Sequence, residues 1–178
     1  MDPQSISKQD MERCVARFSE LRGSGEAYID TRLPGHRRFK INLIGMGVVE
    51  AAENPDLAPN IPMPAHGFNL GMIQAEHGNG AALHAHDTEE VFMPLVGRWA
   101  VTWLGDGEER EIELDPFDTI SVPIGVYRGF RYVGEGTGTL LTLIGGPEAG
   151  KVHWHPDVVS AAAETGLSRD EAGLLETA

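Results

Sequence analysis

Two histidines and one glutamate stand at a spacing that can bind a metal ion. His84 and His86 are two residues apart, and Glu90 follows four residues after His86. Residues two apart on a β-strand point to the same face, so we expect both imidazoles to point the same way. Two imidazoles and a carboxylate suit divalent Fe, Mn, Ni or Zn, and three protein ligands leave coordination positions open for substrate, water or dioxygen. The alternative is that these histidines are ordinary polar residues of a strand.

The segment around these residues resembles the first motif of the cupin superfamily. That motif is a Gly, five residues, His-x-His, three or four residues, a Glu, six residues and a Gly. It is matched here by Gly78, His84, His86, Glu90 and Gly97. The resemblance covers roughly residues 68–146. It implies a small single-domain cupin, with a jelly-roll β-barrel whose interior is lined by the motif.

The second cupin motif is matched only in part. The family has Pro-x-Gly, two residues, a His and an Asn three residues later. Pro123 and Gly125 fit, but Arg128 stands at the position of the His and Tyr132 near that of the Asn. Arginine is always protonated and has no lone pair to offer a cation. The usual fourth protein ligand is therefore missing unless another residue replaces it.

Three arrangements remain open for this site. In the first, the two histidines and the glutamate bind a metal, and Arg128 holds an anionic substrate in a bidentate contact. In the second, Arg128 pairs with Glu90, the metal is absent because a cation there would be repelled, and the pocket binds an organic ligand. In the third, Arg128 points outward and Tyr127 or His77 supplies a ligand.

Alternation along the strands places aromatic side chains on the same faces as Glu90 and Arg128. We expect Arg128 and Tyr132 to contact the substrate as candidate catalytic residues. The candidate pocket residues are Phe92, Trp99, Arg128 and Phe130. The alternative is that these aromatic residues simply fill the core of the barrel.

Composition excludes several other classes of protein. The chain has 178 residues, 14 Lys and Arg against 27 Asp and Glu, and a net charge of −13. This acidity argues against binding to nucleic acid or to an anionic membrane surface. The one cysteine, Cys14, excludes an intramolecular disulfide and a Cys-rich zinc site. With no apolar run of membrane-spanning length and no visible secretory signal, we expect a cytoplasmic protein.

The pattern predicts a mainly β fold, classed as all-β, with a helix at each end. Short β-rich runs separated by Gly, Pro and Asp fill residues 68–146, as in a sandwich or barrel. An apolar stripe from Met11 to Leu21 predicts an N-terminal helix that packs on the barrel or on a second subunit. We divide the chain into an N-terminal extension (1–40), a barrel (41–155) and a C-terminal helix and tail (156–178).

Three shorter segments also carry expectations. The basic cluster at residues 31–40 is interpreted as solvated surface or as intramolecular partners for the acidic excess. The second His-x-His, His153 to His155, has no following Glu at a matching offset and is interpreted as an edge strand or interface piece. The acidic tail from Ser168 is expected to fray.

The leading hypothesis is a mononuclear metal-dependent enzyme of dioxygenase type. Its substrate would be a small aromatic or carboxylate-bearing compound. A metal-free, non-catalytic small-molecule-binding cupin is the alternative, and a metal-dependent isomerase or lyase is the second alternative. A homodimer is expected, because the exposed edges of a jelly roll benefit from cover.

Overall fold

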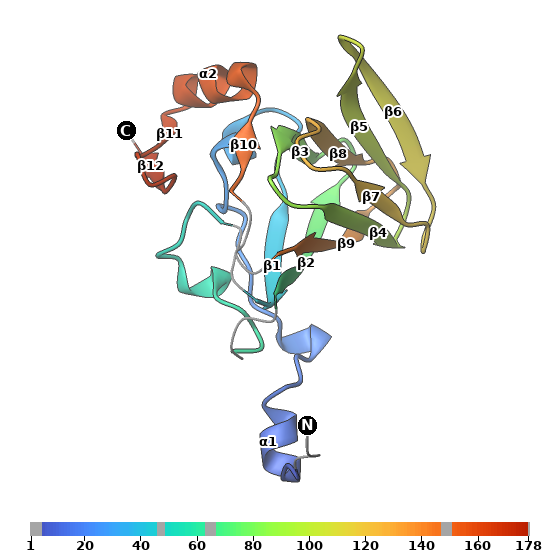
Figure 1. Ribbon diagram of the computed structural model, residues 1–178, viewed down its shortest axis with the longest axis vertical. Coiled ribbons are helices and arrows are strands. Elements are labelled where there is room, and N and C mark those ends of the chain that lie inside the picture. Colours follow the sequence, from blue (N-terminus) through green and yellow to red (C-terminus); the bar gives the residue numbers. More distant parts are fainter. Residues whose placement is uncertain (1–4, 46–48, 63–66, 147–150, 178) are drawn as a thin grey trace.

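The β-rich runs of the sequence form two antiparallel sheets of five strands each (Figure 1). The computed structural model describes residues 5–45, 49–62, 67–146 and 151–177. The first sheet has the order β1 (Phe39–Ile44), β2 (Phe68–Glu76), β9 (Thr137–Gly145), β4 (Glu90–Val96) and β7 (Ile120–Val122). The second has the order β10 (His153–Trp154), β3 (Gly80–Ala85), β8 (Arg128–Tyr132), β5 (Trp99–Gly105) and β6 (Glu108–Leu114). The predicted mainly β jelly roll is confirmed.

Two apolar clusters fill the space inside the strands. One is built around Phe92, Trp99 and Phe130, and the other around Tyr28 and Trp154. Burial alternates along β4, where Glu90, Phe92 and Pro94 face inward. The charged residue Glu90 therefore lies in the interior because it shares the inward face of its strand with core residues.

The N-terminal helix is much shorter than the sequence predicts. Helix α1 (Lys8–Glu12) starts at the expected cap Ser7 but ends after five residues, and a 3₁₀ turn, η1 (Phe18–Glu20), follows. Figure 1 shows α1 standing away from both sheets. Met11 is 51% exposed and Phe18 66%. The predicted packing on the barrel is therefore wrong within this chain, and a short helix without packing is only marginally stable.

The segment after Gly25 lies against the barrel and brings charged residues inside. It contains the 3₁₀ turns η2 (Ile29–Arg32) and, beyond β1, η3 (Pro55–Leu57). In the predicted basic cluster, Arg32 and Arg37 are exposed, but Arg38 and Lys40 are buried. Arg32 and Arg37 thus fit the expectation of solvated surface, and Arg38, which pairs with the buried Asp30 at 2.9 Å, fits the alternative of an intramolecular partner. Lys40 fits neither alternative, because it is buried and has no ion pair among the described residues.

The C-terminal segment is ordered rather than frayed. Helix α2 (Pro156–Glu164) begins with the predicted proline, and Gly166 follows its end with a φ of +76°. The tail then forms a hairpin of β11 (Leu167–Arg169) and β12 (Leu175–Thr177). The backbone N–H of Leu175 donates to the carbonyl of Glu50 at 2.9 Å, so the hairpin is attached to the body. None of the helices described is long and apolar enough to span a membrane.

Candidate metal centre

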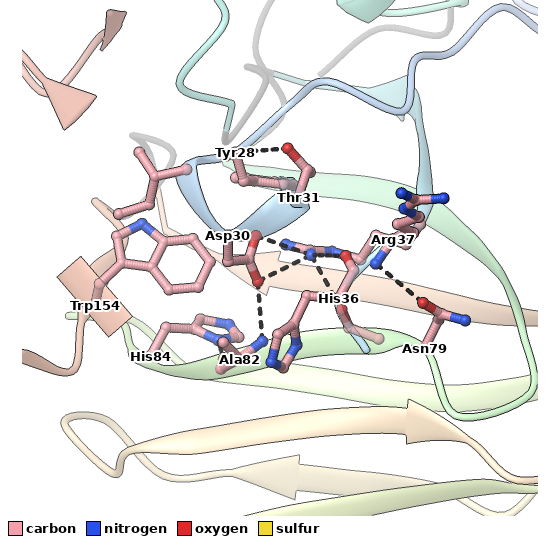
Figure 2. A network of polar contacts seen from close by, with 12 residues as sticks. Tyr28, Asp30, Thr31, His36, Arg37, Asn79, Ala82, His84 and Trp154 are labelled. Atoms are coloured by element: carbon pink, nitrogen blue, oxygen red, sulfur yellow. Dashed lines mark hydrogen bonds and ion pairs between the residues drawn. The ribbon is translucent and has the colours of Figure 1, made fainter. Parts of the chain in front are cut away.

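A bulge in β3 positions the first histidine. The β3–β8 pairing shifts register between Ala81 and His84, which leaves the backbone of Ala82 outside the regular ladder. The buried Asp30 carboxylate accepts the Ala82 N–H at 2.9 Å, and Ala82 O lies 2.8 Å from His84 Nδ1. Figure 2 shows Asp30 above Ala82, with the His84 ring next to Trp154. The N-terminal segment and the bulge therefore fix the orientation of His84 together.

The second histidine follows directly after β3. His86 Nδ1 lies 3.0 Å from the carbonyl oxygen of Lys151. A carbonyl oxygen only accepts hydrogen bonds, so the Nδ1 atoms of both histidines carry the proton in these contacts. Each neutral imidazole then presents the bare lone pair of its Nε2 atom to the interior. This is the tautomer in which imidazole binds a metal through Nε2.

Both lone pairs face one carboxylate oxygen. Glu90 Oε2 lies 3.8 Å from His84 Nε2 and 3.6 Å from His86 Nε2. All three side chains are buried, and one ligand atom from each lies within 4.8 Å of the others. Glu90 reaches this point because it starts β4, where it pairs with Ile144 of β9 on one side and with Val122 of β7 on the other.

Arg128 occupies the interior beside this group. Its Nε donates to Glu90 Oε2 at 3.1 Å, and its Nη1 donates to Val126 O at 3.0 Å. The side chain is 0% exposed, so the arrangement in which Arg128 points outward is wrong. Its remaining nitrogen, Nη2, has no hydrogen-bond partner in the described part of the chain. Arg128 therefore neutralises the carboxylate and keeps one donor unused.

The electrostatics of the group favour a neutral histidine beside an ionised glutamate. Burial, with smaller contributions from His84 and Arg128 and against the opposing effect of Glu90, lowers the pKa of His86 to about 4. Burial alone raises the pKa of Glu90, but His84, His86 and Arg128 together lower it to about 2. At neutral pH, an ionised Glu90 carboxylate therefore faces the neutral imidazole of His86.

These residues fit a divalent cation. Two ligands bound at about 2.1 Å with angles of 90–110° lie roughly 3.0–3.4 Å apart, slightly closer than the spacings in this group. A bound ion would satisfy both lone pairs and the carboxylate, and the hydrogen bonds at Nδ1 are those expected of histidines that bind metal. A hydrogen bond from Arg128 to Oε2 leaves other lone pairs of the Glu90 carboxylate available.

A cavity of about 30 Å³ adjoins the group. Its lining includes His84, His86, Glu90 and Phe130, and also three residues that the sequence analysis did not select, Tyr28, Arg38 and Lys40. On this measure a single water needs about 10–15 Å³, whereas drug-sized ligands occupy about 300–1,000 Å³. The cavity thus has room for a molecule of a few atoms but not for an aromatic ring.

Several predicted pocket residues lie elsewhere in the barrel. Phe92 and Trp99 pack against Phe130 in the core, with ring centroids 5.1 and 6.0 Å away, and neither lines the cavity. The Tyr132 hydroxyl donates to Glu135 O at 2.7 Å, and its ring packs against Trp99. Tyr132 shares a face with Arg128, but four residues of strand span about 13 Å, so it lies outside the site.

The other proposed replacements for the fourth ligand are also remote from the group. The Tyr127 ring packs against His155 at 5.1 Å, and His77 Nδ1 lies 3.0 Å from Gly134 O. The second His-x-His forms the edge strand β10, as predicted, and pairs with β3. Its Trp154 packs on the His84 ring at 5.3 Å and donates to Glu50 at 2.7 Å.

Comparisons with known proteins identify the fold. No family model matches the chain, and no curated protein matches it in sequence. Among solved structures, the oxalate decarboxylase of Lactobacillus farciminis is similar with a TM-score of 0.54 at 12% identity, over 82% of this chain and 36% of that one. An oxalate oxidase gives 0.53 at 15% identity, over 86% of this chain and 69% of that one.

A third similar structure is the cupin domain of Schizosaccharomyces pombe Cnp3. It gives a TM-score of 0.50 at 12% identity and covers 74% of this chain and 73% of that one. The chain spans about a third of the length of the oxalate decarboxylase. At these identities the comparisons establish the architecture, and the similar structures have different functions.

Proposed function

We propose that this chain, which has the cupin fold, is a small metal-dependent enzyme whose divalent ion is held by His84, His86 and Glu90. The observation that carries the proposal is the convergence of two Nε2 lone pairs on one buried carboxylate oxygen, at 3.8 and 3.6 Å. Without a cation or a proton between them, these acceptors repel one another in a site of low dielectric constant.

The reaction type that we propose is oxidative, of the dioxygenase kind. Two histidines and one carboxylate with open positions are the donor set of non-haem iron oxygenases. A divalent ion in such a site supplies Lewis-acid or redox chemistry to a bound substrate. The small cavity favours a small carboxylate over an aromatic substrate, and an isomerase or lyase remains an alternative for the same site.

The protein's own residues prepare this site in three ways. The carbonyls of Ala82 and Lys151 hold the two imidazoles in the metal-binding tautomer. Arg128 holds the Glu90 carboxylate in place and offsets its charge. Apolar side chains of both core clusters, including Phe130 and Trp154, surround the cavity and restrict the entry of water.

A metal-free binding protein is the second candidate, and a specific contact favours it. The ion pair between Arg128 and Glu90 is 3.1 Å long, and the two side chains are 0% and 5% exposed, respectively. It already supplies a positive charge to the carboxylate without a metal.

Metal content separates the two candidates. Protein purified without chelator is expected to contain close to one equivalent of Fe, Mn, Ni or Zn, and to lose it in His84→Ala. Clearly substoichiometric metal, with no gain of activity on reconstitution, would favour the metal-free binding protein over the metal-dependent enzyme.

A further inference from the structure

The interior of the described barrel contains three buried cations, and one of them has no acidic partner. Arg38 pairs with Asp30 at 2.9 Å and Arg128 with Glu90 at 3.1 Å. Lys40 is 3% exposed, yet none of the described carboxylates lies within the 4.0 Å of an ion pair with it. Burying an ammonium group without a partner costs several kcal/mol, so this arrangement calls for an explanation.

Lys40 lines the same cavity as the proposed metal ligands. The neighbouring strand leaves space for its ammonium group. Gly71, on the neighbouring strand β2, has no side chain; a Cβ there would lie 2.6 Å from Lys40 Nζ. The same Cβ position is 3.3 Å from Thr142 Oγ1. The ammonium group and the hydroxyl therefore both lie beside the place that a side chain at position 71 would occupy.

Thr142 supplies a second unused polar group. Its side chain is 3% exposed, and its Oγ1 has no hydrogen-bond partner among the residues described. Thr142 also lines the cavity. A buried ammonium and a buried hydroxyl that both face one small cavity can donate to the same ligand, and donors of this kind select an oxyanion.

We propose that Lys40 and Thr142 form an anion-binding subsite that takes the carboxylate of a small substrate. The inference deepens the proposed function, since this subsite and the residues His84, His86 and Glu90 line one cavity. The volume of about 30 Å³ fits a planar carboxylate with few other atoms and excludes a bulky phosphate ester. Arg128, which the sequence suggested for this role, donates through Nε to Glu90 and does not line this cavity.

The charge state of Lys40 agrees with this role. Burial lowers the pKa of Lys40 to about 8, with the attraction of Glu90 opposing the fall and Arg38 adding to it. The side chain is therefore mostly protonated at neutral pH. A bound carboxylate would supply the partner that the described part of the chain does not offer.

The experiment uses the small number of lysines in the chain. Lys8, Lys40 and Lys151 are the three lysines, so protein with ¹³C-labelled lysine side chains gives three Cε resonances in an NMR spectrum. Lys40→Met assigns the resonance of interest, and Lys8→Met is the matched control at an exposed position. Sodium formate replaces sodium chloride stepwise at constant ionic strength, in the chelator-treated protein and again after loading with Zn²⁺.

We expect a saturable shift of the Lys40 resonance with formate, no saturable shift of Lys8, and weaker or absent binding of phosphate. Thr142→Val, which keeps the shape of the side chain, should weaken formate binding at least tenfold. Thermal unfolding of each variant checks that the fold is retained.

The outcomes separate this inference from the proposed function. Saturable binding of formate in a protein that takes up no metal would support the subsite and count against the metal-dependent enzyme. Uptake of metal with only a linear, non-saturable shift at Lys40 would overturn the subsite and leave the metal site standing. Equal affinity in wild type and Thr142→Val would also overturn it.

Discussion

Arg128 Nε donates a hydrogen bond of 3.1 Å to the same Glu90 oxygen that faces the Nε2 atoms of His84 and His86. The arginine replaces the histidine of the cupin pattern, but it does not leave the interior. Its contact is made through one nitrogen to one oxygen. The Glu90 carboxylate can therefore accept the hydrogen bond from Arg128 and bind a cation at the same time. These two roles lead to different predictions.

Removal of the arginine side chain should make the stability of the fold depend on metal. In Arg128→Met, Glu90 is left as a buried charge without its partner, which typically costs about 3–5 kcal/mol. Added Mn²⁺ or Zn²⁺ should restore much of this loss, because the cation takes over the positive charge. Chemical denaturation of chelator-treated and metal-loaded protein measures both effects.

Arg131→Met is the matched control, since it removes an arginine from the same strand. The Arg131–Glu111 ion pair is 2.6 Å long, but its side chains are 43% and 36% exposed. Exposed pairs contribute about 0–1 kcal/mol, so this variant should unfold nearly as the wild type does. Equal stabilisation of Arg128→Met and of the control by metal would contradict the proposal that Glu90 binds a cation.

Replacement of the arginine by histidine should strengthen metal binding. Arg128→His restores the fourth ligand type of the cupin pattern at a position 0% exposed and next to Glu90. An added imidazole ligand and the loss of a competing positive charge should raise the affinity for Zn²⁺ or Ni²⁺ by at least tenfold. Isothermal titration of chelator-treated protein measures the change. Equal or weaker affinity would mean that residue 128 does not face the cation.

The neutral state of His86 predicts a pH dependence of stability. Burial, reinforced by His84 and Arg128 and opposed by Glu90, lowers its pKa in the folded chain to about 4, below the 6.5 of the unfolded chain. Between these values the unfolded state binds more protons, so stability decreases as the pH falls from 6.5 to 4. The total loss is about 3 kcal/mol by linkage.

Unfolding curves of the chelator-treated protein at several pH values check this dependence. His86→Gln should reduce the slope by about one proton over that range, whereas His77→Gln, at an exposed position, should keep it. Glu90, with a folded pKa of about 2, loses its stabilising contribution only as the pH falls below its ordinary value of 4.5. The same slope in wild type and His86→Gln would show that His86 titrates normally.

The sequence could predict the parts of the site whose residues lie close together along the chain. Strand alternation correctly placed Glu90 inside at the start of β4, and the His-x-His spacing placed both imidazoles together. Lys40 was missed because the basic cluster around it was interpreted as solvated surface or as partners for the acidic excess, and only pairing with β2 reveals the bare backbone of Gly71 beneath it. Asp30 was missed because its partner is a bulge 52 residues away.

Shared faces alone did not predict which residues share a site. Tyr132 lies on the inward face with Arg128, but its hydroxyl holds the Glu135 turn and not a ligand. The prediction of a longer N-terminal helix that packs on the barrel was also wrong. The spacing predicted an apolar stripe on one helix from Met11 to Leu21, but the helix ends at Glu12, and no described surface of the barrel covers the exposed Met11 and Phe18. Tyr132 is separated from Arg128 by about 13 Å along one strand, whereas the packing of the N-terminal helix depends on contacts between elements, which a local pattern does not contain.

The exposed apolar residues near the N-terminus predict a dimer. Ile6, Met11 and Phe18 are 51%, 51% and 66% exposed, and β10 and β6 are the edge strands of the second sheet. Covering this surface with a second copy would bury apolar area and protect the edges. Light scattering of the full chain at micromolar concentration should give twice the mass of 19.3 kDa, and deletion of residues 1–24 should reduce it. A monomeric full chain would contradict the expectation.

The central claim is that His84, His86 and Glu90 bind one divalent ion, and anomalous diffraction at the metal edge tests it most directly. Crystals of protein purified without chelator are expected to show one anomalous peak about 2.0–2.2 Å from both Nε2 atoms and from the Glu90 carboxylate. The same crystals of His84→Ala should lack it. A well-ordered wild-type site with the Arg128–Glu90 contact intact and no anomalous peak, even after soaking in Mn²⁺ or Zn²⁺, would contradict the account.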